Sequence, residues 1–198
     1  MNKNFEIIKK SFKKNNYMYF ENEIMKKHTT FGIGGEVKLL IYPKSIDELA
    51  IIIKTLNENK IKIHFIGSGS NLLINDEKLE CAIISLKKTF KKVFFYNNKV
   101  IVEAGVMLGN LVKQLNSKNI CGYESLIGVP GTVGGALIMN AGAFGSEISN
   151  NFISAKTINK KGLIKKYNKS HITFSYRKSS FPKDEILVEA TFKCVKGD

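Results

Sequence analysis

The sequence predicts an α+β fold in two parts, on three observations: a β-α-β pattern, two hairpin patterns after it, and a basic stretch between them. The β-α-β pattern fills residues 36–66. Its first strand ends before Pro43, a capping box at 45–48 begins an amphipathic helix, and residues 64–66 are an apolar strand. Residues 82–86 predict one more short strand. These features make up the first part.

The second part follows the polar, lysine-rich stretch at residues 87–92. Alternating apolar residues predict hairpins within 93–104 and 153–167, and a closing strand at 186–195. We therefore expect two parts, residues 1–86 and residues 87–198.

One segment of the second part, residues 126–145, is unusually rich in glycine: six of its twenty residues are Gly. Glycine costs conformational entropy on folding, so a dense cluster needs a tight turn or the close approach of a ligand to explain it. Pro130 and Gly131 predict a turn, and Thr132 can cap a short helix over 133–139. The helix start could offer free N–H groups to a phosphate, but a turn into a close-packed helix explains the pattern equally well.

A second glycine-rich loop occupies residues 67–71, Gly-Ser-Gly-Ser-Asn, between the strand at 64–66 and an expected strand at 72–74. Its glycines let the backbone approach a ligand, and successive N–H groups can form a nest for an anion. The loop lacks the third glycine and following helix of a Rossmann fingerprint, and it has no Gly-Lys-Ser/Thr of a Walker A loop. Two such loops predict a long ligand that carries phosphate.

Composition limits the classes of function. The net charge is +14, from 31 basic and 17 acidic residues, and Arg177 is the single arginine among 30 lysines. Proteins that read nucleic acid rely on arginine for bidentate base contacts, whereas these lysines are scattered among Ile and Asn. We therefore expect no specific nucleic-acid partner.

Cysteine, histidine and the N-terminal segment point to no metal and no membrane. The three cysteines form no Cys-x-x-Cys pair, and the three histidines lack metal-ligand spacing. Phe5, Ile8 and Phe12 lie at helical spacing among lysines, which fits a helix packed on the domain better than a membrane-surface helix. With no signal peptide or transmembrane stretch in the sequence, we expect a cytoplasmic monomer.

Four motifs occur in order: Thr-Phe-Gly-Ile-Gly-Gly at 30–35, the loop and its sequel at 67–74, the segment at 128–145, and Phe-Ser-Tyr-Arg-Lys-Ser-Ser-Phe at 174–181. Together, over about residues 20–195, they resemble the UDP-N-acetylenolpyruvoylglucosamine reductase (MurB) family. The resemblance implies a two-subdomain FAD-binding fold of the vanillyl-alcohol-oxidase (PCMH) type, with FAD bound noncovalently between the subdomains.

The resemblance also assigns site residues. The FAD diphosphate is expected on the first loop and the flavin against the second. The expected cofactor-binding residues are Gly67, Ser68, Gly69, Ser70, Asn71, Leu72, Gly128, Pro130, Gly131, Thr132, Gly134, Gly135, Asn140, Ala141, Gly142 and Val188. Tyr176 and Arg177 are expected to bind substrate, with Arg177 catalytic. Phe144 stands where the family commonly has tyrosine, which removes one hydroxyl from the expected substrate site.

The resemblance implies a reaction of peptidoglycan synthesis. NADPH is the reductant, and the flavin passes hydride to the enolpyruvyl ether of UDP-N-acetylglucosamine to give UDP-N-acetylmuramate. That carbon accepts hydride only if the charge developing on the adjacent carboxylate is stabilised, which the planar guanidinium of Arg177 can do. The family's third domain, with a Gly-Ser-Phe-Phe-type segment and a late glutamate, has no match in the 198 residues, so we expect this chain to be inactive alone.

Two other interpretations remain open at this stage. One is a different flavin oxidoreductase of the same fold, acting on a hydroxy acid or a lactone; the motif at 174–181 argues against it. The other is a noncatalytic remnant that binds nucleotide, or a basic module that binds RNA.

Overall fold

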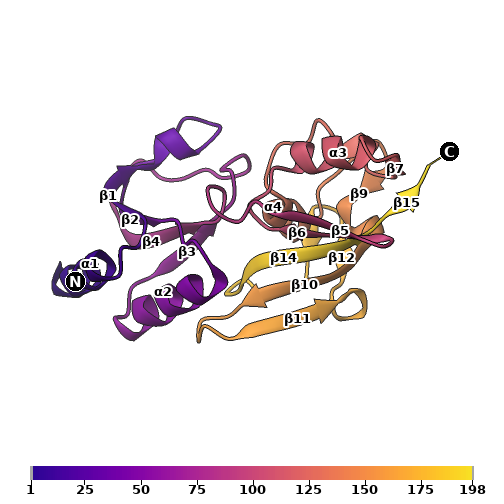
Figure 1. Cartoon of the computed structure of the whole chain (residues 1–198). Coiled ribbons are helices and arrows are strands. Elements are labelled where there is room, and N and C mark those ends of the chain that lie inside the picture. The colour runs from indigo at the N-terminus through magenta and orange to yellow at the C-terminus, as the bar shows by residue number, and fades with distance from the viewer. Residues whose placement is uncertain (1, 198) are drawn as a thin grey trace.

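Two β-sheets, one in each of two lobes, organise the chain (Figure 1). The computed structural model describes residues 2–197, so the outermost residues of the two predicted parts, Met1 and Asp198, lie outside the described residues. The larger sheets draw their strands from residues 19–85 and 93–193. On this basis we propose that the boundary between the two parts of the chain lies between residues 86 and 87.

The first lobe holds a four-stranded sheet in the order β1-β2-β4-β3. Strands β2, β3 and β4 are parallel and β1 is antiparallel to β2, so β2, α2 and β3 form the predicted β-α-β unit with β4 between its strands. Its elements are α1 (Asn2–Lys14), β1 (Tyr19–Ile24), the 3₁₀ helix η1 (Met25–His28), β2 (Glu36–Ile41), α2 (Ile46–Glu58), β3 (Ile63–Ile66) and β4 (Leu79–Ser85).

Helices α1 and α2 cover one face of this sheet. Phe5, Ile8 and Phe12 of α1 are fully buried, as predicted for a helix packed on the domain. The opposite face has a second, smaller core that includes Met25 and Tyr42. The sheet is therefore buried on both faces, as its continuous apolar strands require.

The second lobe holds a five-stranded antiparallel sheet in the order β11-β10-β14-β6-β5. Both predicted hairpins and the closing strand belong to it. Its elements are β5 (Val93–Tyr96), β6 (Lys99–Glu103), α3 (Leu108–Asn116), β7 (Ile120–Cys121), η2 (Glu124–Leu126), α4 (Val133–Ile138), β8 (Gly142–Ala143), β9 (Ser146–Glu147), η3 (Ile148–Asn151), β10 (Phe152–Ile158), β11 (Ile164–Asn168), η4 (Lys169–His171), β12 (Phe174–Ser175), β13 (Lys178–Ser179), β14 (Ile186–Lys193) and β15 (Val195–Lys196).

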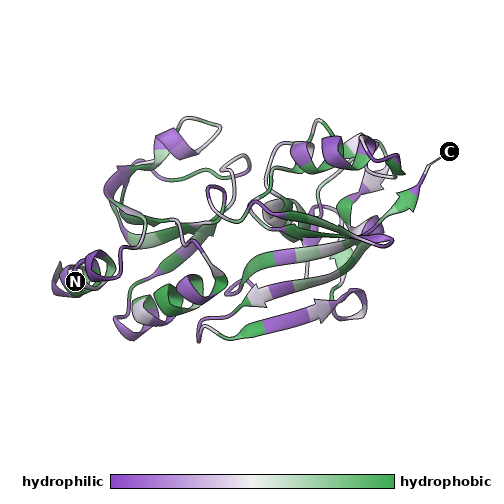
Figure 2. Ribbon diagram, in the orientation of Figure 1, coloured by the Kyte–Doolittle hydropathy of each residue, from purple (hydrophilic) through white to green (hydrophobic). Residues whose placement is uncertain are grey.

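The core of the second lobe lies under α3 and α4. Strand β14 contributes Val188, Ala190 and Phe192, which alternate along the strand and are all fully buried. Figure 2 shows the consequence in hydropathy: β14 is coloured largely as hydrophobic, whereas the edge strand β11 is largely hydrophilic. An exposed edge strand rich in lysine is a common protection against unwanted strand pairing.

Three local predictions differ from the structure. Residues 72–74 form no strand, because Leu73 is 74% exposed and the chain turns at Asn75 before β4 begins. The closing strand ends at Lys193, after which Cys194 N donates to Asn98 O and Val195 pairs with β7. At the start of α2, Ser45 Oγ accepts from Glu48 N at 3.1 Å, but the reciprocal half of the capping box is missing.

Within residues 2–197, none of the helices combines the length and the apolar character needed to cross a bilayer. Over the same residues, no three His, Cys, Asp or Glu side chains are grouped so that they could hold a metal ion.

Candidate functional site

A cleft of about 840 Å³ lies between the two lobes. Both glycine-rich loops line it, together with residues 177–187 and the strand at 63–66. The volume is within the range of roughly 300–1,000 Å³ typical of sites for organic cofactors and ligands.

The first loop, residues 67–71, leaves the carboxyl end of β3, which is where open α/β sheets usually bind ligands. Gly69 has φ +76°, and a Cβ at this position would collide with the carbonyl oxygen of His28. Thr30 N donates to Gly69 O at 3.0 Å, which fixes the loop against the chain after η1. Glycine is therefore required here both for its backbone angle and for its lack of a side chain.

Four N–H groups of the first loop have no acceptor among the residues that the structure describes. Among residues 2–197, Ser68, Gly69, Ser70 and Asn71 donate no backbone hydrogen bond to another residue. Four successive unpaired N–H groups around a left-handed glycine form the kind of concave nest that binds phosphate oxygens. The geometry of this loop supports the predicted diphosphate cradle, which stays a prediction.

The second loop touches the first. Ser70 Oγ donates to Pro130 O at 3.4 Å, and a Cβ on Gly67 would lie 2.7 Å from Thr132 Oγ1. Gly131 has φ +135°, so the predicted Pro-Gly turn requires its glycine. The two loops, about sixty residues apart in sequence, therefore form one continuous wall of the cleft.

The predicted helix after the second loop forms, but its N-terminus is not free to bind an anion. Thr132 caps α4 by accepting from Gly135 N at 3.3 Å. Val133 N donates to Val106 O at 2.8 Å, and Gly134 N donates to Ala104 O at 2.9 Å. The expectation that this helix start presents free N–H groups to a phosphate is wrong, because the neighbouring chain after β6 already accepts those hydrogen bonds.

Glycine in α4 serves close packing instead. A Cβ on Gly134 would lie 2.9 Å from the Cβ of Ala104, so α4 and the end of β6 can approach only because residue 134 is glycine. The sequence left open whether this segment is a phosphate site or a close-packed helix. The hydrogen bonds of Val133 and Gly134 show close packing at these N–H groups, while Gly134 and Gly135 still line the cleft.

Most of the expected cofactor-binding residues line the cleft, and four do not. Those on its lining are Gly67, Ser68, Gly69, Ser70, Asn71, Leu72, Pro130, Gly131, Thr132, Gly134, Gly135 and Ala141. Gly128, Asn140, Gly142 and Val188 lie outside it. Val188 is fully buried beneath the cleft and accepts a hydrogen bond from Ala104 N at 2.9 Å.

Asn140 is a buried link between two turns. It is 1% exposed, and its Nδ2 donates to Glu147 Oε2 at 2.7 Å and to Ser175 O at 3.0 Å. Its Oδ1 is buried with no partner among the described residues. Asn140 thereby ties β9 to β12, the strand just before the turn that carries Tyr176 and Arg177.

Arg177 lines the cleft, and Tyr176 beside it is 83% exposed. Arg177 has φ +55°, and its Nη1 donates to Gly142 O at 2.9 Å. Its guanidinium carbon lies 5.4 Å from the centre of the Tyr176 ring. One bond to a carbonyl leaves most of the five guanidinium N–H groups available, so Arg177 can still pair with an anion at the mouth of the cleft.

Sequence reasoning missed the far wall of the cleft. Phe181, Ile186 and Leu187 form part of it, as does Glu185, which is 7% exposed. The Glu185 carboxylate accepts from Thr157 Oγ1 at 2.5 Å and pairs with Lys165 Nζ at 3.0 Å. This bond and ion pair compensate its charge. The run of apolar residues at 186–188 was the only sign of this wall, and it equally fits a buried strand.

The charges around the cleft favour an anionic ligand. Lys87, Arg177, Lys178 and Lys183 line it, against the single compensated carboxylate of Glu185. Burial, and then Lys62, lower the pKa of His64, so this lining residue is neutral at pH 7. A phosphate nest, a positive rim and apolar walls in one cleft suit a ligand with a diphosphate and flat apolar rings, and the residues present fit FAD.

The comparisons decide the family. Residues 37–168, more than half of the chain, match the model of a family described as FAD binding domain. The chain belongs to this family of FAD-binding domains. It is 37% identical over 178 residues to the UDP-N-acetylenolpyruvoylglucosamine reductase of Alkaliphilus oremlandii, an alignment that covers 89% of this chain and 59% of that reductase.

Solved structures agree on the fold. The chain matches UDP-N-acetylenolpyruvylglucosamine reductase (MurB) from Thermus caldophilus with a TM-score of 0.76 and 28% identity, over 92% of this chain and 63% of that one. It matches 4-ethylphenol oxidase from Gulosibacter chungangensis with a TM-score of 0.64 and 16% identity, over 87% and 37% of the two chains. The predicted fold class is confirmed: this is the two-subdomain α+β FAD-binding fold of the vanillyl-alcohol-oxidase (PCMH) type. The chain spans about three fifths of the length of the reductases it matches.

Proposed function

We propose that this chain is the flavin-binding part of a UDP-N-acetylenolpyruvoylglucosamine reductase, with FAD held noncovalently in the cleft. The observation that carries the proposal is the set of four unpaired N–H groups at Ser68–Asn71 on the wall of a cleft that fits a dinucleotide. The similarity to the reductases over 89% of the chain supports the choice of enzyme.

The FAD diphosphate would lie against Ser68, Gly69 and Ser70, because this loop combines four successive N–H groups that lack an acceptor among the described residues with a glycine that lets a ligand approach the backbone. Lys87 would add a positive charge beside it. The ring systems would lie against the apolar walls, in contact with the backbone of Gly131 and Gly135. Of the four expected residues outside the lining, Val188 would support this wall from behind, through the hydrogen bond that its carbonyl accepts from Ala104 N.

Bound FAD supplies hydride transfer from NADPH to the enolpyruvyl carbon. The contribution of this chain's own residues is positioning and charge. Arg177 would hold the substrate carboxylate near the mouth of the cleft, where its guanidinium stabilises the negative charge that develops there. Tyr176 would contact substrate from the same turn. Phe144 is 96% exposed and offers an apolar surface in place of a hydroxyl.

The remaining parts of the proposal follow from this assignment. The use of NADPH, the product UDP-N-acetylmuramate, a role in peptidoglycan synthesis and cell wall formation, and a cytoplasmic location all belong to the proposed reductase. The chain spans 59% of the length of the Alkaliphilus reductase, and we propose that it holds FAD but lacks full activity by itself.

The test is an equilibrium titration of the purified, flavin-free chain with FAD, followed by flavin fluorescence and absorbance. The expected result is saturation at one FAD per chain, with the absorbance bands shifted by the apolar walls. FMN, which lacks the diphosphate bridge, should bind more weakly. Absence of saturable FAD binding, or equal affinity for FMN, would contradict the proposal.

A further inference from the structure

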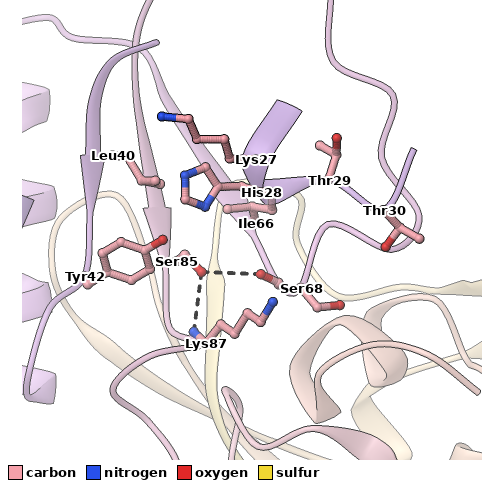
Figure 3. Close-up of a pocket in the computed structure, with 11 residues that line it drawn as sticks. Lys27, His28, Thr29, Thr30, Leu40, Tyr42, Ile66, Ser68, Ser85 and Lys87 are labelled. Atoms are coloured by element: carbon pink, nitrogen blue, oxygen red, sulfur yellow. Dashed lines mark hydrogen bonds between the residues drawn. The ribbon is translucent and has the colours of Figure 1, made fainter. Parts of the chain in front are cut away.

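The first lobe contains a second, smaller cavity of about 180 Å³ (Figure 3). It lies between the chain at residues 27–30, the ends of β2 and β4, and the segment Ile66–Ser68. It adjoins the large cleft, and Gly67, Ser68 and Lys87 contribute to the lining of both. The residues proposed above to hold flavin and substrate do not include those of its inner walls, such as His28 and Tyr42.

The lining of this cavity carries positive charge and hydrogen-bond donors and no acidic side chain. Its titratable residues are Lys27, His28, Tyr42 and Lys87. Glu23 stands outside the lining, where its Oε1 lies 2.8 Å from His28 Nε2 and 3.9 Å from Lys27 Nζ. Lys87 forms no ion pair with any residue of the described chain. Lys87 is thus a cation without an ion-pair partner among the described residues, and a positive charge in a concave site attracts small anions.

The donors converge on the interior. In Figure 3 the side chains of His28, Tyr42 and Ser85 point toward one another, and that of Lys87 extends toward Ser68. The Tyr42 residue is only 3% exposed and makes no side-chain hydrogen bond within residues 2–197. Burial raises the pKa of Tyr42, and Glu23 raises it further, so its hydroxyl keeps its proton and remains a donor at neutral pH.

The framework of the cavity is held in place. Ser85 Oγ donates to Gly67 O at 3.3 Å and accepts from Lys87 N at 3.4 Å, which joins the end of β4 to the first loop. The Tyr42 ring packs edge-on against Phe20, with their centres 6.0 Å apart, and Lys88 Nζ lies 4.4 Å from its centre on the outside. Fixed donors lose little entropy when they bind a ligand.

The volume of this cavity limits which ligands fit in it. A cavity of about 180 Å³ is smaller than the roughly 300 Å³ at which sites for organic ligands begin, so it does not hold a nucleotide. It has room for one tetrahedral anion and a few waters. We infer that this cavity is a binding site for a single small oxyanion of the phosphate class, held by Lys87, His28 and Tyr42.

The position of this cavity also predicts that oxyanion binding here and FAD binding in the large cleft affect each other. An oxyanion here and a diphosphate on Ser68–Ser70 would lie on either side of the same segment and share the charge of Lys87. Two anions that share one cation repel each other, so each should weaken the binding of the other by the same factor. We expect a reduction of a few-fold, because both sites keep their other donors.

The experiment titrates inorganic phosphate into the full 198-residue chain without FAD, at constant ionic strength set with chloride, and follows binding by calorimetry and ³¹P NMR. The expected result is saturation at one phosphate per chain. Lys87→Met and Tyr42→Phe should each weaken binding, with Lys87→Met costing about tenfold, the order for a lost charge-assisted hydrogen bond. Lys91→Met is the matched control: it removes an exposed lysine four residues away that does not line the cavity, and it should leave binding unchanged.

Two results would overturn the inference. If phosphate binding does not saturate, or if Lys91→Met and Lys87→Met weaken it equally, phosphate is attracted only by the net charge of the chain. Phosphate that is excluded completely and competitively by FAD would place the cofactor's own diphosphate in this cavity. Because the phosphate titration uses no flavin, failure of FAD binding would overturn the proposed function and leave this site intact.

Discussion

The two glycine-rich loops are similar in composition and differ in what their N–H groups do. In the loop at 67–71 four successive N–H groups have no acceptor within the described chain, whereas after the loop at 130–132 Val133 and Gly134 donate to the chain that follows β6. We therefore propose that the first loop binds the ligand, whereas the start of α4 after the second loop packs against the chain that follows β6. Glycine content alone does not distinguish these roles, because both need a backbone without side chains.

The largest loss of FAD affinity should come from a substitution in the first loop. Gly69→Val puts a branched side chain at φ +76° against the carbonyl of His28 and distorts the nest, so FAD affinity should fall by about a hundredfold or more, as expected when several charge-assisted hydrogen bonds are lost. Fluorescence titration with FAD measures this loss of affinity. Gly162→Val is the control: Gly162 also has φ +76° and also lies close to a backbone oxygen, that of Ala50, but it is remote from the cleft.

That pair of variants separates binding from folding. Both put a branched side chain at φ +76°, so both should lower the melting temperature, Gly69→Val by more because its Cβ would lie closer to a carbonyl oxygen. Only Gly69→Val should lose FAD. Equal FAD affinity in the two variants would mean that the first loop is not the diphosphate cradle.

The next largest effect is expected on stability, from loss of the hydrogen bonds that the Asn140 side chain donates. Asn140→Ala removes the buried amide that joins Glu147 to Ser175 O and leaves both without that donor, which should cost about 1–3 kcal/mol in the free energy of unfolding. Urea denaturation measures this loss. Asn150→Ala, at an exposed asparagine whose bond to Ser146 Oγ is 3.5 Å long, should change stability by less than about 0.5 kcal/mol. Matching losses in the two variants would refute the linking role of Asn140.

A smaller effect is expected at the helix cap. Thr132→Ala removes the acceptor of Gly135 N and should cost about 1 kcal/mol in unfolding free energy. FAD affinity should change much less than in Gly69→Val, because the second loop provides a wall and not the phosphate donors. A Thr132→Ser variant keeps the acceptor and should restore the stability. If Thr132→Ala abolished FAD binding while the protein stayed folded, the contrast between the loops would be wrong.

The smallest effect should come from Arg177. Arg177→Lys keeps the positive charge and lies on a turn distinct from both loops, so the FAD affinity of this chain should change by less than about twofold, within the usual range for an exposed substitution. The role proposed for Arg177 concerns substrate alone. A large loss of bound FAD in this variant would move Arg177 from substrate recognition to cofactor binding.

Much of the fold was predictable because the spacing of apolar residues along the sequence indicates which side chains are buried. The alternation of Val188, Ala190 and Phe192 predicted a strand, and the helical spacing of Phe5, Ile8 and Phe12 predicted a packed helix. The strand expected at 72–74 is absent because a short apolar run carries no information about its partner: β4 pairs with β2 from Leu79 and with β3 from Ala82, and Leu73 is exposed before this strand begins.

The site was predictable in part. The sequence located both loops, since glycine, proline and small polar residues mark tight turns. It did not show that the N–H groups of Val133 and Gly134 are already paired, because their acceptors, Val106 O and Ala104 O, lie nearly thirty residues earlier in the chain. The lining at 181–187 was missed for the same reason: apolar residues that face a cleft and those that face a core have the same pattern.

Backbone amide NMR of the ¹⁵N-labelled chain during addition of FAD tests the central contrast most directly. The account predicts large shifts for the amides of Ser68, Gly69, Ser70 and Asn71 as they bind the diphosphate, and much smaller shifts for Val133 and Gly134, whose hydrogen bonds remain within the protein. Large shifts at Val133 and Gly134 with little change at Ser68–Asn71 would contradict it, and would assign the diphosphate to the second loop.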